Sequence, residues 1–345
     1  MTADDSGPRS VVRGIELTPD RPVAEVATLA EHAESAGFET VFCSSHYNNR
    51  DPFVALSRVA AATETVQLGP GVVNPYETHP VALASGVATL DEVSGGRTVF
   101  GIGAGDRSTL ANLGIERERP LRRVLETVRV ARQLWAGKRV DHDGTFRAQE
   151  AGLNFEPPGE IPIYVGAQGP DMLRMAAKHA DGTLINAAHP RDLAWASKRI
   201  AEGLDERPTE RLDDHPDERG AFEALAFASV SVGDDPDLAR ETARRPVSFI
   251  VAGAPQPVLD RHDLDPELAG RIGEAIGSGE FSQADDLVTD AMLDAFAVAG
   301  GVETVAKRLD SLRSHVDGIV VAAPLGPDVA RAVELAGEAF ERALA

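Results

Sequence analysis

Short apolar runs alternate with longer amphipathic segments along most of the chain. The short runs are rich in β-branched residues and predict strands at 11–17, 40–43, 66–68, 98–103, 161–165, 182–186, 221–232 and 318–322. The longer segments carry apolar residues at helical spacing and predict helices at 22–36, 52–63, 80–93, 118–136, 171–180, 190–203 and 328–344. Residues 236–313 are predicted to be mostly helical, with breaks near Pro255–Pro257 and Gly277–Gly279.

The alternation of eight strands with helices predicts the fold class. Strands that alternate with helices indicate a parallel sheet, because each helix carries the chain back to the start of the next strand. Strands that are apolar on both faces indicate a sheet covered on both sides. We therefore predict an α/β fold, a closed (β/α)8 TIM barrel. A doubly wound open sheet is the alternative.

The same pattern predicts one domain with two insertions. Residues 1–10 form a polar, acidic extension, and residues 11–345 form the barrel domain. The stretch 139–155 contains Asp143-Gly144 and predicts a hairpin insertion. Residues 236–300 are predicted to be a helical insertion, and 206–220 a charged, solvated loop.

Composition narrows the range of partners. The chain has 55 Asp and Glu against 34 Lys and Arg, a net charge of −21, and only four lysines. Such a surface repels phosphate backbones and anionic lipid, so we expect neither nucleic-acid nor membrane partners. Acidic, lysine-poor surfaces are typical of proteins that work in concentrated salt, where self-repulsion is screened. Acidic specialisation for a basic partner is the alternative.

The chain shows no sign of export or of disulfide chemistry. Its first residues are polar and acidic, and no apolar run is long enough to span a membrane, so we expect a cytoplasmic protein. Cys43 is the single cysteine, which excludes a disulfide within the chain. It lies in an apolar run and is expected to be a small buried hydrophobe.

Residues 68–76 form the most unusual loop of the sequence. Gly69-Pro70-Gly71 ends a predicted strand with a stiff residue between two flexible ones. Val72 and Val73 follow at once, although β-branched side chains disfavour unusual dihedral angles. A bent backbone next to a flat apolar face suits a planar ligand. The alternative is an ordinary connection between a strand and a helix.

Two carboxylates are candidate catalytic acids, because barrel chemistry takes place at the C-terminal ends of the strands. Glu16 shares a strand face with Gly14, and on the inner face it would lie in an apolar cavity. Carboxyl groups in such cavities keep their protons and can donate them near neutral pH. Asp106 follows Gly103-Ala104-Gly105 and is the second candidate. A solvent-facing charge and a plain tight turn are the respective alternatives.

Residues 166–171, Gly-Ala-Gln-Gly-Pro-Asp, enter a predicted helix directly. A glycine turn before a helix N-terminus can hold an anion, since backbone N–H groups point outward there. Simple capping by Asp171 is the alternative. The nine histidines do not have metal-ligand spacing, and we predict no metal site. The sequence also contains neither a nucleophile elbow nor a phosphate-binding P-loop.

Several of these stretches together resemble one family. They are Gly14-Ile-Glu16, His46-Tyr-Asn-Asn49, Leu68-Gly-Pro-Gly-Val-Val-Asn-Pro-Tyr76, Ser94-Gly-Gly-Arg-Thr-Val-Phe-Gly-Ile-Gly-Ala-Gly-Asp106, Gly166-Ala-Gln-Gly-Pro170, Phe249-Ile-Val-Ala-Gly253, Arg261-His262 and Asp294-Ala-Phe296. The chain is similar to the coenzyme F420-dependent methylenetetrahydromethanopterin reductases of archaea, in the bacterial-luciferase-like superfamily, with the composition of a haloarchaeal member. The similarity runs from about residue 11 to the end.

The resemblance implies a binding site for coenzyme F420 in the barrel mouth. It implies a non-proline cis peptide at Gly71–Val72, behind the deazaflavin ring. The residues expected to hold the cofactor are Ser45, His46, Gly71, Val72, Asn74, Gly103, Ala104, Gly105, Gln168 and Gly169. Ser45 departs from the family, which commonly has Asp before the histidine, so a hydroxyl replaces a carboxylate there.

The resemblance also implies the reaction. Reduced deazaflavin would transfer a hydride to the methylene carbon of a tetrahydropterin while an acid, Glu16 or else Asp106, protonates the leaving nitrogen. The pterin is tetrahydromethanopterin or tetrahydrofolate, and a homo-oligomer is expected. The alternatives are a deazaflavin alcohol or sugar-phosphate dehydrogenase, an FMN-dependent oxygenase, and a non-catalytic barrel that binds flavin or pterin.

Overall fold

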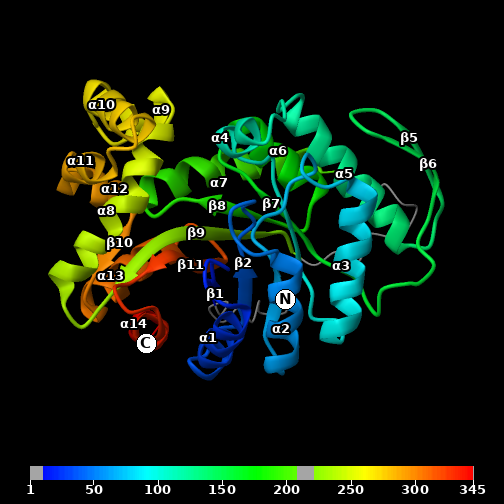
Figure 1. Cartoon of the computed structure of the whole chain (residues 1–345), viewed down its shortest axis with the longest axis horizontal. Helices are drawn as coiled ribbons and strands as arrows, with labels where there is room; N and C mark the ends of the chain where they lie inside the picture. The colour runs from blue at the N-terminus through cyan, green and yellow to red at the C-terminus, as the bar shows by residue number, and fades with distance from the viewer. Residues whose placement is uncertain (1–10, 208–220, 345) are drawn as a thin grey trace, which may run out of the picture.

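The computed structural model describes residues 11–207 and 221–344 (Figure 1). The predicted acidic extension at 1–10 lies outside the described residues, as does most of the predicted charged loop at 206–220.

Eight parallel strands form the predicted barrel. They are β1 (Val12–Glu16), β2 (Thr40–Cys43), β3 (Gln67–Pro70), β4 (Phe100–Ile102), β7 (Ile163–Gly166), β8 (Gly182–Asn186), β9 (Glu223–Val232) and β11 (Gly318–Leu325). The order is β3-β2-β1-β11-β9-β8-β7-β4, and every neighbouring pair is parallel. The (β/α)8 prediction is confirmed, and the open-sheet alternative is wrong.

The two end strands of this order, β3 and β4, close the barrel through two isolated bridges. Leu68 pairs with Thr98 and Val73 pairs with Ile102, both in parallel. The two bridges are five residues apart on the β3 side, from Leu68 to Val73, but only four apart on the β4 side, from Thr98 to Ile102. The β3 side therefore carries one extra residue between the bridges, as in a β-bulge. The extra residue lies where the chain leaves β3 for the barrel mouth.

Nine helices among the described residues surround the strands. They are α1 (Val23–Ser35), α2 (Pro52–Ala62), α3 (Pro80–Ser94), α4 (Arg107–Asn112), α5 (Pro120–Trp135), α6 (Pro170–His179), α7 (Pro190–Asp205), α13 (Val302–Arg313) and α14 (Val329–Leu344). Five of them begin with proline, whose fixed φ suits the first helical turn and whose missing N–H has no partner to lose there. The six-residue helix α4 was not predicted.

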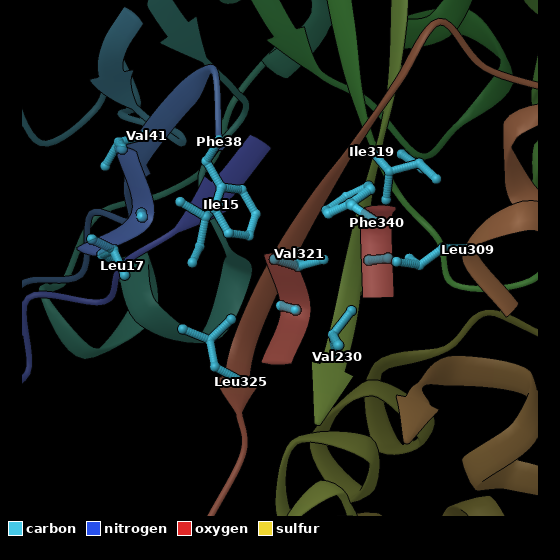
Figure 2. Packing of buried hydrophobic residues seen from close by; sticks show 14 of the residues in the cluster. Ile15, Leu17, Phe38, Val41, Val230, Leu309, Ile319, Val321, Leu325 and Phe340 are labelled. Atoms are coloured by element: carbon cyan, nitrogen blue, oxygen red, sulfur yellow. The ribbon is translucent and has the colours of Figure 1, made fainter. Parts of the chain in front are cut away.

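The hydrophobic core has an outer and an inner layer. The outer layer lies between the strands and the helices and includes Ile15, Val321 and Phe340 (Figure 2). The inner layer fills the barrel and contains Phe42, Val99, Tyr164, Leu184, Leu225 and Val320. The barrel is thus a packed core below its mouth, and only its C-terminal end can admit a ligand.

A group of helices follows β9 on one side of the barrel (Figure 1). It consists of α8 (Pro236–Gly253), α9 (Gln256–Arg261), α10 (Pro266–Gly277), α11 (Phe281–Asp286) and α12 (Asp290–Phe296). Residues 236–313 are mostly helical, as predicted, but they also contain an unpredicted strand, β10 (Val298–Gly300), which pairs in parallel with β9. A three-residue apolar run cannot be told from a buried helix segment by periodicity alone. None of the described helices is both long and apolar enough to cross a membrane.

The hairpin of β5 (Val140–Asp143) and β6 (Arg147–Ala151) lies on the opposite side of the barrel (Figure 1). Glu126 of α5 fastens it. The Thr145 backbone N–H and hydroxyl donate to Glu126 Oε2 at 2.7 and 2.6 Å, Arg122 Nε donates to Oε1 at 2.6 Å, and His142 Nε2 lies 3.1 Å from Oε2. Burial alone would raise the pKa of Glu126, but these hydrogen bonds outweigh it and lower the pKa to about 2.

Replacing Glu126 tests how much its hydrogen bonds to the hairpin contribute to stability. We expect Glu126→Gln to lower the free energy of unfolding by about 2–3 kcal/mol at neutral pH, because the shift in pKa is a stability term. A lowered carboxylate pKa stabilises the fold above about pH 4.5, and this stabilisation is lost as pH falls towards 2. Urea unfolding of both proteins across this range should show the difference shrinking on acidification.

The matched control is Glu241→Gln, since Glu241 is an exposed partner of Arg244 on α8. Exposed pairs contribute little, so its effect should stay under about 0.5 kcal/mol. Equal effects of the two substitutions would contradict a fastening role for Glu126.

Barrel closure depends on one close approach. A Cβ atom built on Gly101 of β4 would lie 1.9 Å from the Pro70 carbonyl oxygen of β3. Gly101→Ala must therefore push β3 and β4 apart, and we expect a loss of at least about 2 kcal/mol in the free energy of unfolding. Gly159→Ala is the control, because a Cβ there meets no atom within 4 Å. Wild-type stability of Gly101→Ala in urea unfolding would refute this view of the closure.

Candidate active site

Glu16 ends β1 and faces the interior of the barrel. Residues of a strand point alternately to its two faces. Ile15 packs in the outer core layer, whereas Val12, an even number of residues from Glu16, packs against the inner layer. The Glu16 side chain is only 2% exposed. The carboxyl group therefore lies at the inner edge of the barrel mouth, as the strand pattern predicts.

Two donors hold the Glu16 carboxyl group. The Thr18 hydroxyl donates to Oε1 at 2.8 Å, and the Ala323 backbone N–H donates to Oε2 at 3.1 Å. Ser229 of β9 in turn donates its hydroxyl to the Ala323 carbonyl oxygen at 2.9 Å. Neither Thr18 nor Ser229 was predicted from the sequence. Thr18 could have been predicted, since the two-residue period of a strand puts it on the same face as Glu16. Ser229 could not, because its contact depends on the register between strands.

Cys43 lies at the end of the neighbouring strand β2 and is fully buried, as predicted. Burial raises the pKa of its thiol well above the usual range, and the charge of Glu16 raises it further. Cys43 therefore keeps its proton at neutral pH and adds no reactive thiolate to the mouth.

The loop after β3 contains the cis peptide bond that the family resemblance implies, between Gly71 and Val72. The Val72 side chain lies against two neighbouring strand ends. A Cβ atom built on Gly103 would be 2.7 Å from Val72 Cγ2, and one built on Gly166 would be 3.3 Å away. Glycine at 103 thus leaves the space that Val72 occupies.

An apolar floor closes the barrel below these residues. Phe42 of β2 is fully buried, and its ring contacts that of Phe227 of β9 edge to face, with centroids 6.3 Å apart. Phe227 and Val72 are only partly buried and pack against the inner core layer from the mouth side. The residue that pairs with Phe42 on β1 is Glu16. The mouth therefore combines an apolar surface with a carboxyl group at its edge.

Asn74 is buried, but its polar atoms are used within its own turn. Its side-chain oxygen accepts from the backbone N–H groups of Tyr76 and Glu77, each at 3.1 Å, and its Nδ2 donates to the Glu77 carboxylate at 2.6 Å. Asn74 therefore shapes the loop, and its direct contact with a cofactor stays a prediction.

The other predicted cofactor residues form the rim. Ser45 is half-buried and His46 exposed beyond β2, and Ala104 and Gly105 are half-buried beyond β4. Gln168 and Gly169 are exposed where β7 leads into α6, so the N-terminus of that helix opens at the mouth. The barrel brings all these segments to one end, because each follows the C-terminal end of a parallel strand.

Asp106 has the features of a helix cap. It is exposed and precedes α4, where its Oδ1 accepts from the Thr109 backbone N–H at 2.9 Å and from the hydroxyl groups of Ser108 and Thr109. Burial alone would raise the pKa of Asp106, but these hydrogen bonds lower it below its ordinary value. A carboxylate held in its charged form is a poor proton donor near neutral pH.

A second polar cluster fixes the helical segment α8–α12 to the barrel. Asp192 of α7 accepts from Arg261 and lies 2.7 Å from Nε2 of His262. His189 caps α7, and its ring meets that of His262 edge to face at 4.9 Å. Burial, followed by the charges of His262 and Arg308, lowers the pKa of His189 to about 4. His189 is thus neutral at physiological pH.

The arrangement suits proton donation to a flat molecule. It offers an apolar floor, a glycine-lined wall, a polar rim and one buried carboxyl group. Within residues 11–207 and 221–344, no three His, Cys, Asp or Glu side chains are placed to hold a metal ion.

Comparisons with known proteins agree with this geometry. The sequence matches the family described as luciferase-like monooxygenase over residues 9–317. A 5,10-methylenetetrahydromethanopterin reductase from Archaeoglobus fulgidus is 42% identical over 94% of this chain and 97% of its own length. An F420-dependent glucose-6-phosphate dehydrogenase from Nakamurella multipartita is 31% identical over 73% of this chain and 76% of its own.

The three-dimensional structure of this chain is also similar to a solved structure. The coenzyme F420-dependent tetrahydromethanopterin reductase from Methanopyrus kandleri superposes with a TM-score of 0.86 at 37% identity. The superposition covers 95% of this chain and 97% of that one. The chain therefore belongs to the luciferase-like family and, within it, to the 5,10-methylenetetrahydromethanopterin reductases.

Proposed function

We propose that this protein reduces a methylene-tetrahydropterin to the methyl form with coenzyme F420 as hydride donor. The observation that carries the proposal is the Glu16 carboxyl group, buried at the C-terminal end of β1, where Glu16 pairs with Phe42 and the Phe42 ring contacts Phe227. An acid next to a flat apolar surface is what this reaction requires, since the substrate nitrogen must gain a proton. The names of the relatives at 37–42% identity supply the substrate class.

The residues present fit a deazaflavin. The apolar side chains of Val72 and Phe227 are both partly exposed and pack against the inner core layer, so they can contact a ring system. Ser45, His46 and Gly105 supply polar groups around it, and the N-terminus of α6 at Gly169 suits the phosphate of a cofactor tail. When bound, coenzyme F420 would supply two electrons as a hydride.

The protein itself supplies orientation and a proton. The methylene bridge of the pterin must open to an iminium before its carbon can accept a hydride, and the released nitrogen must be protonated. Glu16 is our assignment for this proton donor. Thr18 and Ala323 hold its carboxyl group from both oxygens, which fixes its direction. The packed interior below excludes water from that side.

The alternatives predict different substrates. A sugar-phosphate dehydrogenase on the same barrel is supported only at 31% identity over 73% of the chain, against 42% over 94% for the reductase from Archaeoglobus fulgidus. An FMN-dependent oxygenase would consume oxygen, and a binding protein would not turn over at all. Tetrahydrofolate is the second candidate pterin, and a homo-oligomer is expected from the family.

A spectral assay of reduced-F420 oxidation tests the function. We expect turnover with methylene-tetrahydromethanopterin, with methylene-tetrahydrofolate assayed in parallel, and no oxygen consumption with FMN. Glucose 6-phosphate and a secondary alcohol with oxidised F420 are the controls. Reaction with a control substrate and none with either pterin would replace the proposal by a dehydrogenase. Absence of turnover with every substrate would favour a binding protein.

Substitution of the two candidate acids separates their roles. Glu16→Gln keeps the size of the side chain but cannot donate the proton, and we expect turnover to fall by about 10²–10⁴-fold with cofactor affinity retained. Asp106→Asn should cost less than about tenfold in turnover, and its main effect should be about 1 kcal/mol of stability from the weakened cap of α4. Full turnover in Glu16→Gln would remove Glu16 from the mechanism.

A further inference from the structure

The proposed reaction leaves Glu16 without its proton after every turnover. The carboxyl group must then be reprotonated before the next substrate is reduced. Only 2% of the Glu16 side chain is exposed, and the inner core layer lies below it. Bulk water therefore has little direct access to the carboxyl group, and the proton must arrive through a neighbouring residue.

Among the described residues, two groups donate hydrogen bonds to the carboxyl group, and Cys43 ends the neighbouring strand. The Ala323 backbone N–H donates to Oε2, but an amide cannot give up its proton at neutral pH. Cys43 is fully buried, so its thiol has no contact with bulk water. The Thr18 hydroxyl donates to Oε1 at 2.8 Å, and a hydroxyl can donate one proton while it accepts another.

Thr18 also reaches the solvent side. It lies just beyond β1, is partly exposed, and is followed by the buried Pro19. The Ala323 N–H at Oε2 can only donate, whereas the Thr18 hydroxyl at Oε1 can turn to accept a hydrogen bond, so Oε1 is the better place for the acidic proton. The oxygen that must be reprotonated is therefore the one that Thr18 contacts.

We propose that Thr18 is the proton relay of Glu16. After Glu16 has protonated the substrate nitrogen, the Thr18 hydroxyl proton passes to Oε1 while a water on the exposed side gives a proton to Thr18 Oγ1. The net change is one proton moved from solvent to the carboxylate, and no electrons move. The inference rests on the proposed function, which requires Glu16 to cycle between acid and carboxylate.

The test compares a first turnover with continuous turnover. Thr18→Val keeps the shape but lacks the hydroxyl, and Thr18→Ser keeps the hydroxyl. With enzyme in excess over methylene-pterin, the first oxidation of reduced F420 needs no reprotonation of Glu16, so Thr18→Val should slow it far less than it slows continuous turnover. With substrate in excess, its steady-state rate should fall at least about tenfold. Thr18→Ser should restore most of that rate.

The matched control is Thr28→Val. The Thr28 hydroxyl donates to the Ala24 carbonyl oxygen on the exposed face of α1, far from any proposed proton path. Both of its rates should equal those of the wild type. A wild-type steady-state rate in Thr18→Val would overturn the relay. Equal slowing of first and continuous turnover, with no recovery in Thr18→Ser, would also overturn it, because that result indicates a positioning role.

Failure of the proposed function gives a different result. If the wild-type protein does not oxidise reduced F420 with either methylene-pterin, the reaction itself is wrong. If the wild type turns over and Glu16→Gln does so equally well, Glu16 is not the acid. The relay is refuted separately only when Glu16→Gln is slow and Thr18→Val is not.

Discussion

The contact between β3 and β4 is the constraint on which the rest of this structure depends. A parallel sheet becomes a closed barrel only when its two end strands are joined. Here the end strands, β3 and β4, are joined by two isolated bridges. Gly101 allows the Pro70 carbonyl to approach β4 more closely than any side chain would permit. The extra residue on the β3 side lies in the same stretch as Val72, whose side chain meets Gly103 and Gly166. Closure and the shape of the site thus have the same origin.

A second constraint is the cost of placing a carboxyl group inside a barrel. Burial of an unpaired polar group costs several kcal/mol, so it persists only with hydrogen-bond partners. Thr18 and Ala323 supply them for Glu16 from two ends of the chain, residues 18 and 323. The barrel brings these ends together because β1 pairs with β11. The carboxyl group is therefore held in this way only when β1 and β11 are paired.

The fold could be predicted from the sequence because the strand and helix periodicities were clear. Parts of the site could not be predicted in this way. Glu16 was identified because period two fixes its face once its strand is recognised. Asp106 was a weaker candidate, since a carboxylate after a glycine turn serves equally well as a cap, and only the contacts with Ser108 and Thr109 show the cap. Ser229 was missed because its contact with Ala323 depends on register between strands far apart in sequence. Arg97, within a motif that carried the resemblance, supports the opposite end of the barrel by donating to the Ala60 and Val66 carbonyls.

The proposed reaction depends on Glu16 as the donor of the proton to a pterin nitrogen in the barrel mouth. The most direct test is a crystal structure of the protein with coenzyme F420 and a methylene-tetrahydropterin. We expect a Glu16 carboxyl oxygen within hydrogen-bond reach, about 3 Å, of the bridging nitrogen. A structure in which the pterin nitrogens lie beyond the reach of Glu16 while another acid contacts them would contradict it.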